Sequence, residues 1–311
     1  MRLITIVAAA LLVNVLLPAA AVQNQGFLGR WNLTGTGQDT NRVYWLEVSE
    51  QNGQLSGMFL NRGGSPVPLA SVAVQGKELV FQLAPGANKQ PGAEFRAALD
   101  GAKLVGTTKA ADRTINFVGV RPPKWPASNA NAKHNYGTPV ELFDGKSFAA
   151  FDTQPSDYPI TWTVEDGVLT NAPPTRNLMS KQKFWNFRLQ AEYKLTAKSN
   201  SGIYLRGRYE MQVLDDSGTP PEKHGHMAIY AWTPPLVNAS KPAGEWQTVD
   251  IVIVGNRVTA TLNGQKVHDN AEIQAITGGA LDADELNPGP ILIQGDHTKV
   301  WFKKITVTPI N

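Results

Sequence analysis

The sequence predicts an all-β protein, with a small antiparallel β-barrel or sandwich followed by a larger two-sheet jelly roll. Three observations support this prediction. Short segments alternate apolar and polar residues, as strands with one wet face require. Asn-Gly, Asp-Gly and Gly-Asn pairs separate many of these segments, and such pairs tolerate the positive φ angles of tight hairpin turns. No segment shows a long apolar stripe with helical spacing.

The first 21 residues predict a cleavable signal peptide. Arg2 supplies a positive charge, residues 3–17 are almost wholly apolar, and the small residues at 18–21 offer a cleavage site. An apolar stretch of about 15 residues is shorter than the roughly 20 that span a bilayer. We therefore expect an exported protein, periplasmic or secreted, without a membrane span. The chain contains no Cys, so we expect no lipid on an N-terminal cysteine.

Composition also limits the chemistry. With no Cys among 311 residues, disulfides, thiolate metal sites and cysteine nucleophiles are excluded. The net charge is +3, and no run of Lys and Arg with interleaved aromatic residues is present, so we expect no nucleic-acid partner.

The first domain is predicted from five short strand-like segments within residues 22–121. Turn signals at Asn52-Gly53, Gln75-Gly76 and Asp100-Gly101 break them apart. Trp31 lies near the start of this domain, and a lone large aromatic residue usually packs inside. We therefore expect Trp31 to plug the barrel. Residues 122–138 are rich in Pro, Asn and Ala without apolar periodicity, which predicts a linker.

Residues 139–311 carry longer strand signals and are predicted to form the jelly roll. Asp166-Gly167 lies between two short apolar segments and indicates a hairpin. Residues 187–195 alternate apolar and polar side chains, which is typical of a half-buried strand. Further strands are expected near 249–254, 258–262, 291–294 and 300–307.

The segment 200–215 contains most of the polar candidates. Alternation along a strand places Tyr204 and Arg206 on one face, and it places Glu210 and Gln212 on one face of the next strand if the chain turns at Gly207. The opposite face is apolar and consists of Ile203, Leu205, Met211 and Val213. The polar face is either a solvated surface or the floor of a sugar groove, and the pattern alone does not distinguish the two.

Six motifs occur in order along the second half of the chain. They are LFDGK at 142–146, WTVEDGVL at 162–169, NSGI at 200–203, YEMQVLD at 209–215, KPAGEW at 241–246 and QGDH at 294–297. Together they resemble the 3-keto-disaccharide hydrolase domain family, over about residues 139–311. The resemblance implies a concanavalin A-like jelly roll that acts on sugars oxidised at C3. No family resemblance extends to the first domain.

The resemblance also implies a route for bond cleavage. A ketone at C3 acidifies the C2 proton, so a base can remove it, and the glycosidic oxygen then leaves by elimination before water adds. Retaining β-glucanases of this shape use Glu-x-Asp-x-x-Glu, whereas here Gln212 follows Glu210 and Asp215 has the opposite parity. We therefore expect one base, one electrophile and one acid rather than an acid and nucleophile pair.

These roles can be assigned to particular residues. Glu210 is the candidate base, and the Arg206 guanidinium could stabilise an enolate or hold a pair of sugar hydroxyl groups. His297, preceded by a carboxylate that could fix its tautomer, is the candidate for an acid–base or ligand role. A surface Arg–Glu pair and an ordinary loop histidine are the competing interpretations. The expected substrate-binding residues are Tyr204, Gln212, Asp215, Tyr230 and Trp232. Trp232 is expected either to stack on a sugar ring or to pack on the prolines that follow it.

A metal site is only weakly indicated. His224 and His226 are two residues apart and could bind a divalent metal ion if Asp215 or Asp216 joined them, whereas the competing interpretation is a polar loop. No cofactor follows with certainty. Two functions remain open, an exported enzyme that cleaves 3-keto-glycosides and a non-catalytic lectin-like protein, and both would bind a small saccharide.

Overall fold

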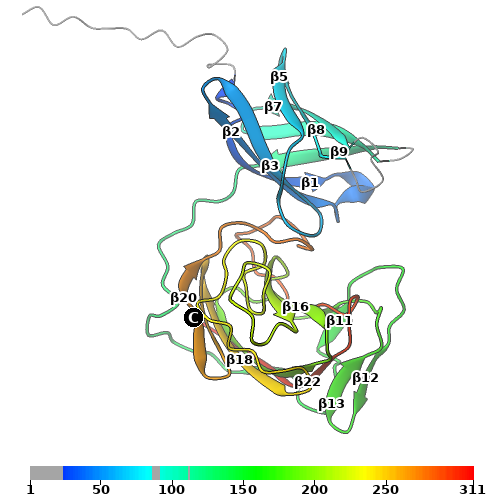
Figure 1. Cartoon of the computed structure of the whole chain (residues 1–311), viewed down its shortest axis with the longest axis vertical. Coiled ribbons are helices and arrows are strands. Elements are labelled where there is room, and N and C mark those ends of the chain that lie inside the picture. Colours follow the sequence, from blue (N-terminus) through cyan, green and yellow to red (C-terminus); the bar gives the residue numbers. More distant parts are fainter. Residues whose placement is uncertain (1–23, 86–91, 111–112) are drawn as a thin grey trace, which may run out of the picture.

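The computed structural model describes residues 24–85, 92–110 and 113–311. The predicted signal peptide lies outside the described residues. Within them, two β units follow one another along the chain (Figure 1). Strands dominate both units, and residues 139–311, all of which are described, contain no helix. The predicted all-β fold class is confirmed.

In the first unit, the described residues form a nine-stranded antiparallel sheet in the order β4-β3-β2-β1-β9-β8-β7-β6-β5. Its two edge strands, β4 and β5, are separated by only two residues in the chain, so the sheet must curl back on itself. The curled sheet encloses an aromatic core, and Trp31 is buried inside it as predicted. The strands are β1 (Gly29–Gly35), β2 (Val43–Gln51), β3 (Gln54–Asn61), β4 (Val67–Pro68), β5 (Ser71–Gln75), β6 (Glu78–Gln82), β7 (Glu94–Asp100), β8 (Lys103–Ala110) and β9 (Arg113–Val120), and a 3-10 turn, η1, covers Gly37–Asp39. We call this unit the barrel.

In the second unit, two antiparallel sheets face each other as a jelly roll. The larger has eight strands in the order β12-β13-β22-β15-β18-β19-β20, with β10 also paired to β22. These strands are β10 (Val140–Phe143), β12 (Trp162–Glu165), β13 (Val168–Asn171), β15 (Phe187–Leu195), β18 (Trp246–Val254), β19 (Arg257–Leu262), β20 (Gln265–Glu272) and β22 (Val300–Pro309). The smaller has five strands in the order β11-β14-β21-β16-β17. These are β11 (Phe151–Thr153), β14 (Leu178–Ser180), β16 (Asn200–Leu205), β17 (Tyr209–Leu214) and β21 (Leu292–Ile293).

The jelly-roll core lies between these two sheets. Along β15 every second residue is buried, from Phe187 to Leu195, which confirms the predicted alternation. Four apolar residues of β16 and β17 belong to the same core, namely Ile203, Leu205, Met211 and Val213. Because side chains alternate along a strand, Tyr204 of β16 and Glu210 and Gln212 of β17 point away from the core. That outward face carries the candidate site.

The barrel packs directly on the jelly roll. Trp45 of β2 meets Trp232 edge to face, with ring centroids 4.9 Å apart. Asn32 of β1 donates a hydrogen bond to the Glu285 carboxylate at 2.7 Å. Val43, Trp45 and Leu60 of the barrel pack in one hydrophobic cluster with the jelly-roll core. The barrel and the jelly roll therefore share an interface and are not connected by the linker alone.

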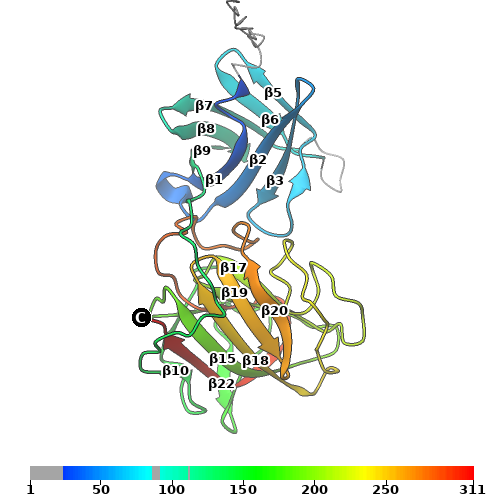
Figure 2. The ribbon, with the colours of Figure 1, turned by 90° about the vertical axis from the view of Figure 1, so that its left-hand side faces the viewer.

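The segment between β9 and β10 contains no strand and runs along the jelly roll (Figure 2). Trp125 stacks on Trp185 with ring centroids 5.8 Å apart, and Asn131 bonds to Asp269. The segment predicted as a linker is thus docked along part of its length. No helix among the described residues has both the length and the apolar character needed to cross a bilayer.

Candidate functional site

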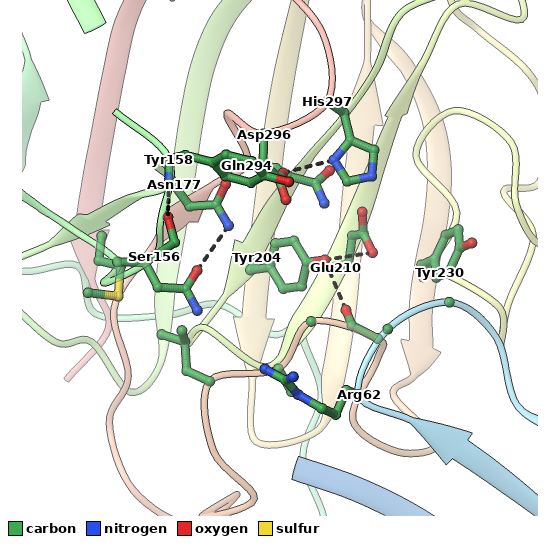
Figure 3. A pocket seen from close by; sticks show the side chains of 18 of the residues that line it. Arg62, Ser156, Tyr158, Asn177, Tyr204, Glu210, Tyr230, Gln294, Asp296 and His297 are labelled. Carbon is green, nitrogen blue, oxygen red and sulfur yellow. Dashed lines mark hydrogen bonds and ion pairs between the residues drawn. The ribbon is translucent and has the colours of Figure 1, made fainter. Parts of the chain in front are cut away.

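A cavity of about 650 Å³ lies on the outward face of the five-stranded sheet (Figure 3). This volume is within the range of small-molecule sites. Its floor comes from β16 and β17, and the segments that wall it come from both units. The floor and the adjoining wall carry Tyr204, Glu210, Gln212, Gln294, Asp296 and His297.

Glu210 lies at the centre of the floor, with only 5% of its surface exposed. Strand pairing sets Tyr204 directly opposite it and Gly202 opposite Gln212. A Cβ atom on Gly202 would lie 2.5 Å from Glu210 Oε1, so the glycine leaves the space that the carboxyl group fills. The NSGI motif therefore has a direct steric role in the site.

Burial changes the acidity of Glu210. Loss of water around the carboxylate raises its pKa from 4.5 to about 8, against the lowering effects of the Tyr204 hydrogen bond and of His297. A carboxyl group with a pKa near the working pH is suited to general acid–base chemistry. The position and the pKa together make Glu210 the foremost candidate for a proton-transfer residue.

Tyr204 connects Glu210 to the loop that follows β20. Its hydroxyl oxygen lies 3.0 Å from Glu210 Oε2 and 2.9 Å from the carbonyl oxygen of Gly278. A phenol has one proton and can donate it to one of these acceptors. When Glu210 is protonated, its own O–H can donate to Tyr204 while Tyr204 donates to Gly278. When Glu210 is ionised, Tyr204 can donate to the carboxylate, so both protonation states of Glu210 have a hydrogen-bond partner.

His297 enters the same cavity from the QGDH motif. Its Nδ1 lies 2.8 Å from Asp296 Oδ1, and its side chain is 44% exposed. The hydrogen bond with Asp296 raises the pKa of His297, and the Glu210 carboxylate adds to this effect. The raised pKa extends to higher pH the range over which His297 carries a proton that it could donate.

Two further candidates line the cavity, Gln212 and Tyr230. Gln212 is buried, and its Oε1 accepts a hydrogen bond from the backbone N–H of Val213 at 3.0 Å. Tyr230 packs edge to face on His224, with ring centroids 5.2 Å apart. The structure thus brings together Glu210, His297, Tyr204, Gln212 and Tyr230.

Arg206 does not face the cavity, and this corrects the prediction from strand alternation. Strand β16 ends at Leu205, and Arg206 begins the turn with a left-handed φ of 55°, which removes its side chain from the alternation. The guanidinium is fully buried, donates to the carbonyl oxygens of Trp185 and Gly255 at 2.6 and 2.8 Å, and lies over the Trp185 ring. Desolvation lowers the pKa of Arg206 to about 10. Arg206 is a structural residue of the turn and cannot serve as the electrophile.

Asp215 and Trp232 also lie outside the cavity lining. Asp215 accepts a hydrogen bond from the backbone N–H of Lys198 at 2.7 Å, since it sits past the end of β17 with the opposite parity. Trp232 packs on Trp45 of the barrel and donates through Nε1 to the carbonyl oxygen of Ile276. Neither side chain lines the cavity, so the structure does not support their expected roles in substrate binding.

The two histidines considered as metal ligands diverge. His226 is buried, with Nε2 2.7 Å from the Tyr193 hydroxyl and Nδ1 against the backbone of Leu214. His224 points instead to Ser65 of the barrel, at 2.6 Å. Across the described residues, no group of three or more His, Cys, Asp or Glu side chains could hold a metal ion.

Several cavity residues were not anticipated. Gln294 is the first residue of the QGDH motif, and its Oε1 is buried with no hydrogen-bond partner. Tyr158 is 43% exposed at the cavity, Asn177 lies beside it, and Arg62 comes from the barrel (Figure 3). The last three have no local sequence signal, because they meet only when distant loops pack together.

The jelly roll corresponds to a known domain family. A family model described as the 3-keto-alpha-glucoside-1,2-lyase-like domain matches residues 138–308. A curated 3-keto-disaccharide hydrolase from Bacteroides thetaiotaomicron is 26% identical over 164 residues, which is 41% of this chain and 57% of that protein. This chain therefore matches little more than half of the length of that relative.

Solved structures were also matched. A candidate glycosyl hydrolase from Parabacteroides distasonis is 28% identical, with a TM-score of 0.48 over 54% of this chain and 82% of its own. The endo-beta-1,3(4)-glucanase SCLam is 11% identical, with a TM-score of 0.39 over 61% of this chain and 95% of its own. The family match covers more than half of the chain and agrees with the resemblance carried by the six motifs. This chain therefore belongs to the 3-keto-alpha-glucoside-1,2-lyase-like domain family.

Proposed function

We propose that this protein is an exported enzyme that cleaves 3-keto-glycosides by base-assisted elimination followed by hydration. The observation that carries this proposal is Glu210, a buried carboxyl group with a pKa of about 8 on the floor of a sugar-sized cavity, beside a histidine held toward its protonated form. A carboxylate with a raised pKa is a stronger base than an ordinary carboxylate, which favours removal of the weakly acidic C2 proton next to a ketone. The family description, a 1,2-lyase-like domain, supports the same bond change.

The first step moves a proton and an electron pair. The Glu210 carboxylate takes the C2 proton, and the C2–H electrons form an enolate with the C3 oxygen. The enolate electrons then form the C1–C2 double bond as the C1–O bond breaks. The departing oxygen takes a proton from His297. The products are a 1,2-unsaturated 3-keto sugar and the released alcohol, and later addition of water across the double bond gives net hydrolysis.

Gln212, rather than the buried Arg206, is placed to stabilise the enolate. Its Oε1 already accepts from Val213, so its amide N–H groups remain as donors toward the cavity. A fixed donor at the site of a developing negative charge stabilises the enolate. The Tyr204 hydroxyl instead donates to the Glu210 carboxylate and so holds the base in position.

An ordinary retaining mechanism has less support. It requires two carboxyl groups that act on opposite sides of the glycosidic bond. Among the described residues that line the cavity, only Glu210 and Asp296 carry carboxyl groups, and Asp296 is engaged with the His297 ring. The arrangement therefore favours one carboxyl base working with a histidine.

The test compares one disaccharide in its 3-keto and unoxidised forms, in deuterated water, with and without a chelator. Only the oxidised form should be cleaved, and recovered 3-keto substrate should carry deuterium at C2 because proton removal is reversible. Equal cleavage of both forms would indicate an ordinary glycosidase. Measurable affinity without any cleavage would indicate the lectin-like alternative. The chelator arm reports any metal requirement.

Export is proposed from residues 1–21 alone. N-terminal sequencing of the protein recovered from its native host should begin near Val22. A mature chain that still begins at Met1 would contradict the export proposal and leave the reaction unaffected.

A further inference from the structure

We propose that Arg62, in the loop between β3 and β4 of the barrel, forms a distal subsite that binds the second sugar of the substrate. The barrel would then give the enzyme a preference for 3-keto-disaccharides over simple 3-keto-glycosides. This inference rests on the proposed function, since it concerns the other end of the same cavity.

The barrel loop is a wall of the cavity. Asn41, Arg62, Gly63 and Gly64 all line it, although every other lining residue comes from the jelly roll. The lining residues of the barrel therefore enclose space that a jelly roll alone would leave open to solvent.

The loop is held in place by contacts to the jelly roll. The backbone N–H of Gly279 donates to the carbonyl oxygen of Arg62 at 2.6 Å, and Ser65 Oγ lies 2.6 Å from His224 Nε2. A Cβ atom on Gly278 would lie 2.5 Å from the Gly64 carbonyl oxygen, so the two backbones approach as closely as glycine permits. These contacts fix the backbone of the loop, and with it the place from which the Arg62 side chain extends.

The Arg62 side chain is exposed, and its guanidinium N–H groups are available to donate hydrogen bonds. Among the described residues no carboxylate lies within ion-pair distance of it, whereas most arginines of the barrel are paired with Asp, Glu or backbone carbonyls. A guanidinium presents N–H groups in a planar fork, which can donate to two neighbouring hydroxyl oxygens at once. A sugar ring displays such pairs of hydroxyl groups.

Arg62 lies away from Glu210 and His297, the residues proposed to transfer protons. The Gly278-Gly279 pair stands between it and Tyr204, since Gly278 accepts from the Tyr204 hydroxyl and Gly279 donates to the Arg62 carbonyl. In Figure 3, Arg62 and His297 lie on opposite sides of the Tyr204–Glu210 pair. A 3-keto ring placed over Glu210 and His297 leaves the Arg62 end for the next ring. The cavity of about 650 Å³ is about twice the lower limit for small-molecule sites, which leaves room for that ring.

The test measures the kinetics of Arg62→Ala and Arg62→Lys on two substrates, a 3-keto-disaccharide and the methyl glycoside of the same 3-keto sugar. Arg96→Ala is the matched control, because Arg96 is an exposed barrel arginine outside the cavity lining. For Arg62→Ala we expect the KM for the disaccharide to rise about 10- to 100-fold, as for loss of hydrogen bonds from a charged donor. The kcat and both constants for the methyl glycoside should stay within about threefold. Arg62→Lys should fall between, because it keeps the charge and loses the planar fork.

Two kinetic results would overturn the subsite. Equal losses on both substrates would place Arg62 on the keto ring, and unchanged constants on both would remove it from the site. If the wild-type protein cleaves neither substrate, the proposed reaction fails, and calorimetric binding of the two compounds then tests the subsite separately. Weaker binding of only the disaccharide by Arg62→Ala supports the subsite. Equal binding by variant and wild type, or no binding by either, refutes it.

Discussion

Replacement of Glu210 by Gln should lower activity and raise stability at alkaline pH. Gln has nearly the same shape as Glu, and its carbonyl oxygen can still accept from the Tyr204 hydroxyl. An amide cannot take the C2 proton, so turnover of a 3-keto substrate should fall by roughly 10²–10⁴-fold. The stability effect has the opposite sign for an electrostatic reason.

The size of the stability effect follows from the pKa of Glu210. Burial raises this pKa from 4.5 to about 8, so the folded protein holds the proton more tightly than the unfolded chain does. The resulting stabilisation is fully present below pH 4.5 and is lost as the pH rises through 8. The loss amounts to at most about 5 kcal/mol of unfolding free energy, at 1.36 kcal/mol for each pH unit between the two pKa values. Gln is neutral throughout, so Glu210→Gln should match wild type near pH 5 and exceed it by several kcal/mol near pH 9.

Urea unfolding at pH 5, 7 and 9, together with initial rates on a 3-keto-disaccharide, measures both effects. Glu192→Gln serves as the control, because Glu192 is only partly buried on the larger sheet, in an ion pair with Lys303. Its rate should be unchanged, and its stability should shift by less than about 1 kcal/mol. Loss of both rate and stability in Glu210→Gln at pH 9 would show that the carboxylate is structural. A retained rate would show that it is not the base.

Three further predictions concern neighbouring residues. Arg206→Ala should lower the free energy of unfolding in urea by about 3 kcal/mol or more, because two carbonyl oxygens lose a buried charged donor. The protein that remains folded should keep its KM. A raised KM without loss of stability would show that Arg206 belongs to the site. In wild type, kcat/KM should follow a bell-shaped pH profile, because the reaction needs Glu210 ionised and His297 protonated. His297→Gln should abolish the falling limb of this profile, and persistence of that limb would exclude His297 as the acid. Gly279→Ala should reduce kcat at least tenfold because its Cβ would lie 2.6 Å from the Tyr204 hydroxyl at a φ of +81°, and a crystal structure with Tyr204 unmoved would contradict this reason.

Local sequence patterns determined the strands and the turns. Asp166 and Gly167 adopt φ values of 51° and 76° between β12 and β13, as a tight hairpin requires. Alternation along β15 and β17 correctly separated core residues from outward ones, and this separation placed Glu210 and Gln212 on the site face. These features could be read from the sequence because each depends on the φ and ψ angles of adjacent residues.

Tertiary packing decided what surrounds Glu210. Alternation holds only within a strand, so it failed at Arg206, one residue beyond the end of β16, where a left-handed φ turns the side chain into a buried pocket beside Trp185. Arg62 reaches the cavity only because the barrel docks on the jelly roll, and no local pattern contains that contact. The raised pKa of Glu210 likewise comes from neighbours that exclude water, and desolvation depends on atoms that are distant in the chain. The sequence alone thus identified the carboxyl group, whereas the packing of distant segments set its acidity and the walls that would select its substrate.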